Sequence, residues 1–241
     1  IVSPSGPYLI YSNHSINSST SNNQFVESMS SASLSLSVEN VGIESASDID
    51  VTISTNDPYI ILSNTNTSID GIEPGQIGQT NQPVYFIVNG NAPDNYYANF
   101  SANFYYDNLN WQSNFSVLVH APNFELDNLA VQDQNLDGVW DSGEEITISI
   151  DLMNSGSSGF GMYPGATIQT NSPNAEVLTN SSENIFYGIS ANDTYVGSFT
   201  VLALSDVAPG TVVDFSILWG PSEISQEYCL EYLCPDLATY N

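Results

Sequence analysis

Twelve residues near the middle of the chain, Asp133 to Glu144, have the side chains and the spacing of a calcium-binding loop. Their sequence is DQNLDGVWDSGE, with oxygen-bearing side chains at positions 1, 3, 5, 9 and 12 and glycine at position 6. In such a loop alternate side chains converge on one ion, while the glycine makes the sharp turn. The predicted ligands are the side chains of Asp133, Asn135, Asp137, Asp141 and Glu144, together with the backbone carbonyl of Val139. About seven flexible oxygens suit Ca2+ better than Mg2+.

The flanks of this loop predict strands, whereas an EF-hand places helices there. After Glu144 the sequence EITISIDL, residues 145–152, puts Ile146, Ile148, Ile150 and Leu152 on one face, which is the period of a half-buried strand. We therefore expect a calcium loop between two strands, where the ion staples them. The alternative is a solvated acidic turn that binds no metal.

The rest of the chain has the same β character. Alternating or β-branched segments, separated by turn sequences such as NDP, EPG and APG, predict strands. The segments are 32–41, 48–54, 84–88, 99–106, 114–120, 145–152, 166–170, 197–204 and 212–219. No amphipathic helical stretch of useful length occurs, so the sequence predicts an all-β fold.

An internal repeat predicts two domains. Four segments recur in the same order at shifts of 114 to 116 residues: 35–42 with 149–156, 52–58 with 167–173, 92–93 with 208–209, and 99–101 with 214–216. We place the boundary near Pro122, which gives domains 1–122 and 123–241. About seven strands in each repeat predict two tandem immunoglobulin-like β-sandwich domains.

The repeat also compares the acidic loop with its counterpart in the first domain. Positions 1, 3, 5, 9 and 12 of the loop align with Ser19, Ser21, Asn23, Glu27 and Ser30. Four carboxylates are thereby reduced to one. The first domain is expected to carry a degenerate loop that does not hold calcium.

The charge composition excludes several classes of function. The chain contains 27 acidic residues and no Lys or Arg, for a formal net charge of -27. Nucleic acids and anionic membranes are bound through Lys and Arg, so neither is an expected partner. No apolar run is long enough to span a membrane, and the first residues lack the pattern of a signal peptide. We expect a mature segment of a secreted or cell-surface protein.

Residues that could support catalysis are few. Cys229 and Cys234 are the only cysteines, and we favour a local disulfide in an oxidising compartment over two thiols. Neither has a cation nearby to activate it, and His14 and His120 are expected to have surface or capping roles. No motif singles out a pair of carboxylates. The sequence therefore predicts no catalytic residue.

Two further patterns are weak. Seven N-x-S/T sequons, at Asn13, Asn17, Asn66, Asn99, Asn114, Asn180 and Asn192, are about what this Asn-, Ser- and Thr-rich composition gives by chance. Tryptophans 111, 140 and 219, with tyrosines 96, 97, 105 and 106, could form a sugar-stacking platform. We expect core and cross-strand packing instead.

Taken together, these segments resemble a known family. PYLIY at 7–11, NVG at 40–42, TNDP at 55–58 and the loop at 133–145 resemble the immunoglobulin-like modules of large secreted Bacteroidota-type proteins. These modules occur in adhesins and downstream of gingipain-family cysteine peptidase domains. The resemblance covers both repeats and implies a cell-surface or secreted location within a longer polypeptide. The chain departs from the family in its degenerate first loop and in having no cationic side chain apart from histidine.

Two functional interpretations follow from these observations. The first is a structural or adhesive segment of a filament, stalk or adhesin, stiffened by calcium, whose partners are neighbouring modules or subunits and a glycan or protein ligand. The second is the accessory, non-catalytic region of a secreted hydrolase, or a carbohydrate-binding module. Flanking repeats would favour the first interpretation, and a flanking peptidase domain the second.

Overall fold

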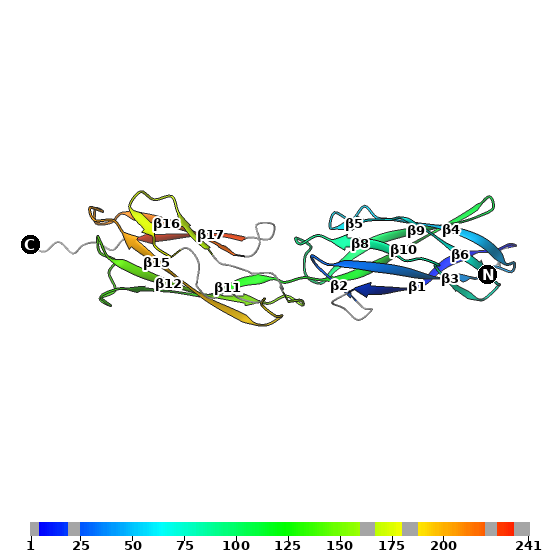
Figure 1. The fold of residues 1–241 in the computed structure, drawn as a ribbon, viewed down its shortest axis with the longest axis horizontal. Coiled ribbons are helices and arrows are strands. Elements are labelled where there is room, and N and C mark those ends of the chain that lie inside the picture. The colour runs from blue at the N-terminus through cyan, green and yellow to red at the C-terminus, as the bar shows by residue number, and fades with distance from the viewer. Residues whose placement is uncertain (1–4, 19–24, 160–166, 180–187, 220–225, 234–241) are drawn as a thin grey trace, which may run out of the picture. The chain divides into compact units, whose positions relative to one another are not determined.

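The computed structural model describes residues 5–18, 25–159, 167–179, 188–219 and 226–233, with side chains up to Ile217. All the regular elements in these ranges are strands, so the prediction of an all-β chain is confirmed (Figure 1). The chain divides into two compact units, unit 1 (Ile1–Ala121) and unit 2 (Pro122–Asn241). Within the described ranges, no helix is long and apolar enough to cross a membrane.

Unit 1 is a sandwich of two sheets. The first sheet, sheet A, has the order β1 (Leu9–Ser18), β3 (Ser31–Asn40), β8 (Val84–Val88) and β5 (Ile60–Leu62), with β7 (Ile77–Gln79) also paired to β3. The second, sheet B, has the order β2 (Phe25–Glu27), β10 (Leu109–His120), β9 (Tyr96–Tyr106), β4 (Ala46–Ser54) and β6 (Asn66–Ile72). Every pairing is antiparallel except that of β2 with β10.

Unit 2 repeats this order. One sheet runs β11 (Phe124–Asp133), β12 (Glu145–Asn154), β15 (Thr194–Ala203) and β14 (Ala175–Val177), which matches β1, β3, β8 and β5. The other runs β13 (Thr167–Thr170), β16 (Val212–Trp219) and β17 (Gln226–Leu233), which matches β4, β9 and β10. Each unit is an immunoglobulin-like β-sandwich, as the sequence predicts.

The cores explain why these segments are strands. In β3, Ala32, Leu34, Leu36 and Val38 alternate with exposed or half-buried serines, so one face of the strand is apolar. In β12 the isoleucines and Leu152 of the predicted strand fill the same face, each at most 1% exposed. Burying a side chain of this size contributes about 1.5–3 kcal/mol, so the two alternating strands anchor the two cores.

Both units begin with a strand that the sequence patterns do not predict. β1 and β11 lie at sheet edges, and each contains a bulge, between Tyr11 and Asn13 and between Leu126 and Asn128. A bulge adds a residue to one strand and interrupts the two-residue period of burial. The bulges therefore break the apolar–polar alternation by which β1 and β11 could have been predicted as strands.

The predicted disulfide lies outside the described side chains. Cys229 falls within β17, where its backbone pairs with Ser216, and Cys234 follows the last described residue. The pairing of Cys229 with Cys234 stays a prediction.

Candidate functional site

The acidic loop joins β11 to β12, as the sequence predicts. Its first residue, Asp133, ends β11 and pairs with Ile146, while Glu144 directly precedes β12. Within the loop Leu136, Gly138 and Gly143 have positive φ angles of 64°, 83° and 84°. These left-handed residues coil the backbone tightly, and an added Cβ at Gly138 would meet no atom, so φ is what favours glycine there.

The first half of the coil brings oxygen atoms together. The backbone N–H of Asp137 donates to Asp133 Oδ2 at 2.8 Å and to Asn135 Oδ1 at 2.9 Å, so both oxygens lie beside one nitrogen. Gly138 N–H also donates to Asp133 Oδ2, at 3.2 Å. Asp137 Oδ1 in turn accepts a hydrogen bond of 2.9 Å from the Val139 N–H. Positions 1, 3 and 5 thus form one continuous hydrogen-bonded turn.

Glu144 connects the two halves of the loop. Its Oε1 accepts from the Asn135 N–H at 3.0 Å and its Oε2 from the Asp141 N–H at 2.9 Å. The residue is only 7% exposed, in a chain with no Lys or Arg to pair with it. A buried carboxylate is costly unless it is hydrogen-bonded or bound to a metal, so these two N–H groups are essential to the loop.

The loop is also fastened to the core of unit 2. Trp140, which is 4% exposed, donates from its indole N–H to the Glu144 carbonyl at 3.0 Å. Its ring lies 6.1 Å from that of Phe215, measured between centroids. A shift of the backbone at Glu144 would therefore also shift the Trp140 ring in the core. The buried ring agrees with the expected core packing of Trp140 and leaves no ring face for a sugar to stack on.

The fit of this loop to calcium is partial. Among the described residues, no three Asp, Glu, His or Cys side chains gather as a metal-binding group, so the carboxylates of Asp133, Asp137, Asp141 and Glu144 do not meet at one point. Their oxygens are instead held by backbone N–H groups. Asp133 Oδ2 accepts two of these hydrogen bonds, but Asp137 Oδ1 and both Glu144 oxygens accept one each and keep a second lone pair for a cation. Calcium binding stays a prediction.

Asp133 shows how strongly the coil favours an ionised carboxylate. Burial raises the pKa of its carboxyl, but hydrogen bonds from the backbone N–H groups of residues 133, 136, 137 and 138 outweigh this and lower the pKa below its ordinary value. Asp133 is therefore ionised at neutral pH, as a calcium ligand must be.

The corresponding segment of unit 1 is built differently. Residues 19–24, which include three of the aligned positions, lie outside the described residues. Beyond them, Phe25–Glu27 forms β2, and fully buried Val26 takes the place in the core that Trp140 has in unit 2. The Ser30 hydroxyl donates to the Glu27 carbonyl at 2.5 Å. Over residues 25–30, the connection from β1 to β3 consists of the paired strand β2 and a short turn.

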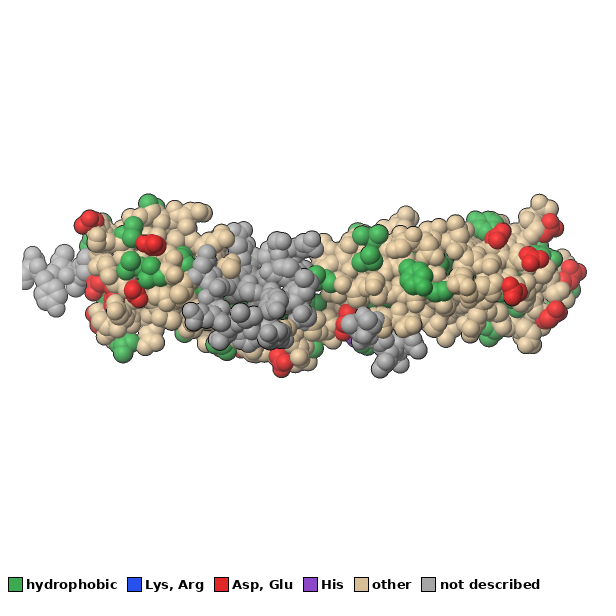
Figure 2. Space-filling view, in the orientation of Figure 1, with side chains coloured by type: hydrophobic (Ala, Val, Ile, Leu, Met, Phe, Trp, Pro, Cys, Tyr) green, Lys and Arg blue, Asp and Glu red, His purple; other side chains and the backbone are tan. Residues whose placement is uncertain are grey.

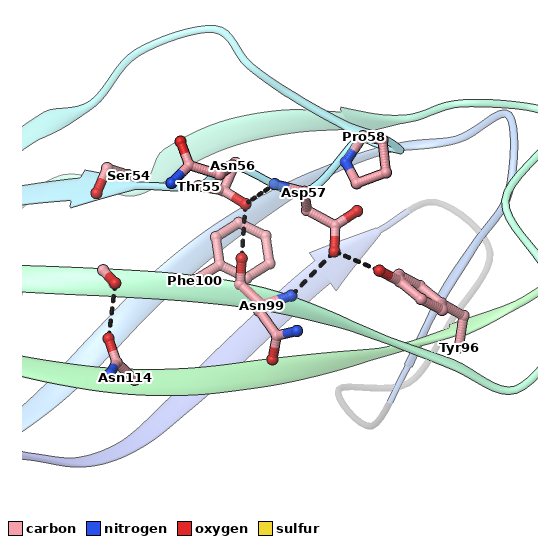
Figure 3. Close-up of a pocket in the computed structure, with 10 residues that line it drawn as sticks. Ser54, Thr55, Asn56, Asp57, Pro58, Tyr96, Asn99, Phe100 and Asn114 are labelled. Atoms are coloured by element: carbon pink, nitrogen blue, oxygen red, sulfur yellow. Dashed lines mark hydrogen bonds between the residues drawn. The ribbon is translucent and has the colours of Figure 1, made fainter.

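A second candidate site, which the sequence patterns do not indicate, is a hollow of about 450 Å³ at the end of β4 (Figure 3). It is lined by Ser54, Thr55, Asn56, Asp57, Pro58, Tyr96, Asn99, Phe100, Ser101 and Asn114. Asp57 Oδ2 accepts from the Tyr96 hydroxyl at 2.8 Å and from the Asn99 N–H at 3.2 Å, and its Oδ1 accepts from the Tyr59 N–H at 3.0 Å. The hydrogen bond to Asp57 raises the pKa of Tyr96, as does burial.

Unit 2 contains the same turn without this carboxylate. Thr55 and Thr170 each donate a hydroxyl to a carbonyl of the next strand, at 2.6 and 2.8 Å, and each accepts the N–H two residues on. At the Asp57 position unit 2 has Ser172, whose hydroxyl accepts the Asn174 N–H at 3.2 Å. A hydroxyl is sufficient for this turn, so the turn by itself does not require the carboxylate of Asp57.

The remaining sequence candidates lie apart from both sites. His14 Nδ1 is 2.6 Å from the Tyr11 hydroxyl, and burial lowers the pKa of His14. His120 stacks on Phe25 with centroids 4.1 Å apart. Trp111 is half-buried and meets Tyr8 edge to face at 6.2 Å, and the side chain of Trp219 lies outside the described set.

Comparison with known proteins adds nothing on function. No family model and no curated protein matches the chain. Among solved structures, a chimeric titin Z1Z2-Z1Z2 tandem functionalised with a GRGDS peptide from fibronectin is 16% identical, covering 90% of this chain and 98% of that chain, with a TM-score of 0.26. The YadV chaperone is 10% identical, over 91% and 99% of the two chains, at 0.23. The secreted serine protease VesC from Vibrio cholerae is 9% identical, over 79% and 46%, at 0.25.

Proposed function

We propose that the chain is a non-catalytic structural or adhesive segment of a secreted or cell-surface protein, and that the loop 133–144 of unit 2 binds calcium. The observation that carries the calcium assignment is Glu144. It is a nearly buried carboxylate, it reaches both halves of the loop, and the sequence supplies no Lys or Arg to neutralise it. A divalent cation is the counter-charge that such a site lacks.

Calcium would act here as a staple. The ligand residues Asp133, Asn135, Asp137, Asp141 and Glu144, with the Val139 carbonyl, lie between β11 and β12, and Trp140 links the same loop to the core. Binding to the folded state alone raises its stability by RT ln(1 + [L]/Kd), about 2.7 kcal/mol at a hundredfold excess over Kd. Unit 2 is stabilised by the ion, and unit 1 is not.

The surface location and assembly role follow from the resemblance to immunoglobulin-like modules of Bacteroidota-type proteins. In this chain the N-x-G segments each supply a buried asparagine, and the segments at 55–58 and 170–173 each form a threonine turn. The expected partners are neighbouring modules or subunits of a larger assembly. An accessory region of a secreted hydrolase is the competing assignment, and a peptidase domain in the parent sequence would establish it.

Calorimetric titration of calcium into the chelator-treated chain, with thermal melting in calcium and in chelator, tests the proposal. We expect one site and a melting temperature several degrees higher in calcium. Asp137→Ala should remove both effects, whereas Asp127→Ala, an exposed acidic residue of β11 outside the loop, should keep them. Absence of binding heat and of a melting shift in the unaltered chain would show that the loop is an acidic turn without an ion.

A further inference from the structure

The outer face of sheet B is a flat array of uncharged polar side chains, which we call the amide face. It consists of Thr52 and Ser54 from β4, Asn99, Ser101 and Asn103 from β9, and Gln112, Asn114 and Ser116 from β10. The registers place Thr52, Asn103 and Gln112 in one row and Ser54, Ser101 and Asn114 in the next. All are exposed or half-buried, because the alternate residues of each strand fill the core.

Much of the hydrogen-bonding capacity of the amide face is unused. The Ser101 hydroxyl donates to Asn114 Oδ1 at 2.6 Å, which turns the Asn114 NH2 group outward. Within the described part of the chain, the side-chain amides of Asn99, Asn103 and Gln112 have no protein partner. Each free amide offers two donors and one acceptor. The amide face can therefore both donate hydrogen bonds to an uncharged ligand and accept them from it.

The charge of the chain narrows the ligand class. The eight residues of the amide face include no carboxylate, although the chain has a net charge of -27 and Asp50 of β4 lies exposed on the same outer face, paired with Tyr105. On the visible side of unit 1 most acidic side chains gather toward one end and leave the middle clear (Figure 2). An anionic ligand would be repelled by the negative charge of the chain, and a cation would find only the single carboxylate of Asp50 beside these amides. A neutral ligand rich in hydroxyl groups is complementary to it.

Two exposed tyrosines extend the same face. Tyr97 and Tyr105 lie on β9 with the same alternation as Asn99 and Asn103, and they are 60% and 42% exposed. Tyr105 is eight residue steps from Tyr97 along the strand, which is roughly 26 Å at 3.3 Å per residue. Aromatic rings present an apolar body that stacks on the C–H faces of sugars. The face thus suits an extended chain of several sugars that runs along β9.

The hollow at Asp57 adjoins one end of this surface. Ser54, Asn99, Ser101 and Asn114 belong to both the amide face and the lining of the hollow (Figure 3). Asp57 and Tyr96 add a carboxylate acceptor and a phenol there, held in place by their mutual hydrogen bond. At this end of the face the Asp57 carboxylate could accept hydrogen bonds from sugar hydroxyl groups, as exposed Asp50 could beside Tyr105.

Unit 2 shows that the fold does not require these residues. At the positions of Tyr97 and Asn99, β16 has Val212 and Asp214, and Ser172 replaces Asp57. The register of β13 with β16 is the same as that of β4 with β9, so the substitutions fall on the same outer face. At these three positions the aromatic ring, the amide and the carboxylate of unit 1 are therefore replaced in unit 2, although exposed Gln169 of β13 gives unit 2 an amide at the position of Ser54.

We propose that the amide face of unit 1, with Tyr97, Tyr105 and the hollow at Asp57, binds a neutral polysaccharide. The inference rests on the adhesive function proposed above and names its ligand class. The polymer lies along β9, hydrogen-bonded to the amides of Asn103, Gln112 and Asn114 and stacked on the tyrosines. Its site is in unit 1 and is independent of the calcium loop.

Affinity electrophoresis of the full chain through gels containing neutral polysaccharides (β-glucan, mannan, xylan, galactan) or acidic ones (alginate, heparin) tests this assignment. We expect retardation by at least one neutral polymer and by no acidic one. The double variant Tyr97→Ala, Tyr105→Ala should weaken binding about tenfold. The double variant Asn103→Asp, Gln112→Glu should also weaken binding about tenfold, because it replaces two neutral amides by carboxylates that cannot donate hydrogen bonds. Tyr85→Ala, an exposed tyrosine on the outer face of sheet A, should leave binding unchanged.

Two measurements separate this inference from the calcium proposal. Asp137→Ala and chelator should remove the calcium effect and leave polysaccharide retardation intact. Absence of retardation by every neutral polymer, with the calcium shift present, would overturn the amide-face assignment alone. Mass spectrometry of the native protein provides the other decisive result, because glycans attached to Asn99 or Asn114 would make the face a carrier of sugar and not its receptor.

Discussion

The side-chain oxygen of Asn154 accepts a hydrogen bond of 3.0 Å from the backbone N–H of Asn123, and thereby ties the end of β12 to the start of unit 2. The same oxygen accepts the Gly156 N–H at 3.1 Å, and the side-chain NH2 group faces carbonyls of residues 158, 189 and 190. Asn40 makes the equivalent bonds in unit 1, to the N–H groups of Tyr8 and Gly42 and the carbonyls of Glu44 and Ile72. Both asparagines are fully buried.

Replacing Asn154 by Ala is expected to lower the free energy of unfolding of unit 2 by about 3 kcal/mol or more, because it leaves several buried N–H and C=O groups unpaired. Urea unfolding followed by hydrogen exchange of unit-specific peptides measures the loss. Asn128→Ala is the matched control, since Asn128 is exposed and makes a single 3.3 Å bond to Asp151, and it should cost less than about 0.5 kcal/mol. Equal losses in the two variants would contradict this account of the N-x-G segment.

Gly42→Ala is expected to destabilise unit 1 by about 1–3 kcal/mol through overpacking. A Cβ at Gly42 would lie 2.2 Å from the Gly6 carbonyl oxygen and 2.5 Å from the Tyr8 nitrogen, both of which are backbone atoms. The N-terminal segment would have to move away. Gly6→Ala, whose Cβ would meet no atom within 4 Å, serves as the control and should leave thermal melting unchanged. A melting temperature unaffected by Gly42→Ala would refute the close approach.

Asp57→Ser is expected to leave the stability of unit 1 within about 1 kcal/mol of the original chain, because a hydroxyl caps the same turn in unit 2. Asp57→Ala should cost more, since the N–H of Tyr59 then loses its acceptor. In both variants the Tyr96 hydroxyl loses Asp57, so the pKa of Tyr96 should fall toward its ordinary value. Spectrophotometric titration of the tyrosines, compared with Tyr96→Phe, detects that change, and an unaltered titration would contradict it.

His14 should make the stability of unit 1 depend on pH. Burial lowers its pKa in the folded state below the ordinary value of about 6.5, so the unfolded chain takes up the proton first. The stability contributed by neutral His14 is fully present above about pH 6.5 and declines as the pH falls through the folded-state pKa. His14→Phe should flatten the stability profile in that window, measured by urea unfolding at a series of pH values. An NMR titration that places His14 at or above 6.5 would contradict the prediction.

The sequence carries most of the information on the fold, because both cores depend on strands with regular alternation, such as β3 and β12. The edge strands β1 and β11 escape detection because their bulges interrupt that alternation. β17 gives no clear alternation in QEYCLEYL either. What remains visible is the repeated N-x-G, whose function becomes clear only when the partners of Asn40 and Asn154 are seen.

The two sites differ in how far sequence can predict them. The loop at 133–144 is contiguous, so its spacing is visible in one segment, although its carboxylates are held by N–H groups and do not meet at one point. The hollow and the amide face join residues far apart in the chain, such as Asp57 with Tyr96 and Asn103 with Gln112. Only strand register places those pairs together. A serine- and asparagine-rich composition alone does not show which of its amides share a surface.

The bonds around Asn123 have a mechanical consequence. Besides its N–H bond to Asn154, Asn123 accepts from the Ser155 N–H through its carbonyl at 2.8 Å and donates through its side chain to the Ser155 hydroxyl at 2.9 Å. Tension that enters unit 2 through its first residues therefore loads this group of short bonds before it reaches the β11–β12 ladder. Tyr8 and Val41 offer a corresponding attachment in unit 1, with the Val41 N–H bonded to the Tyr8 carbonyl at 2.9 Å. Each sandwich thus has short hydrogen bonds at the residue before its first strand, and a pull on that strand would load them first.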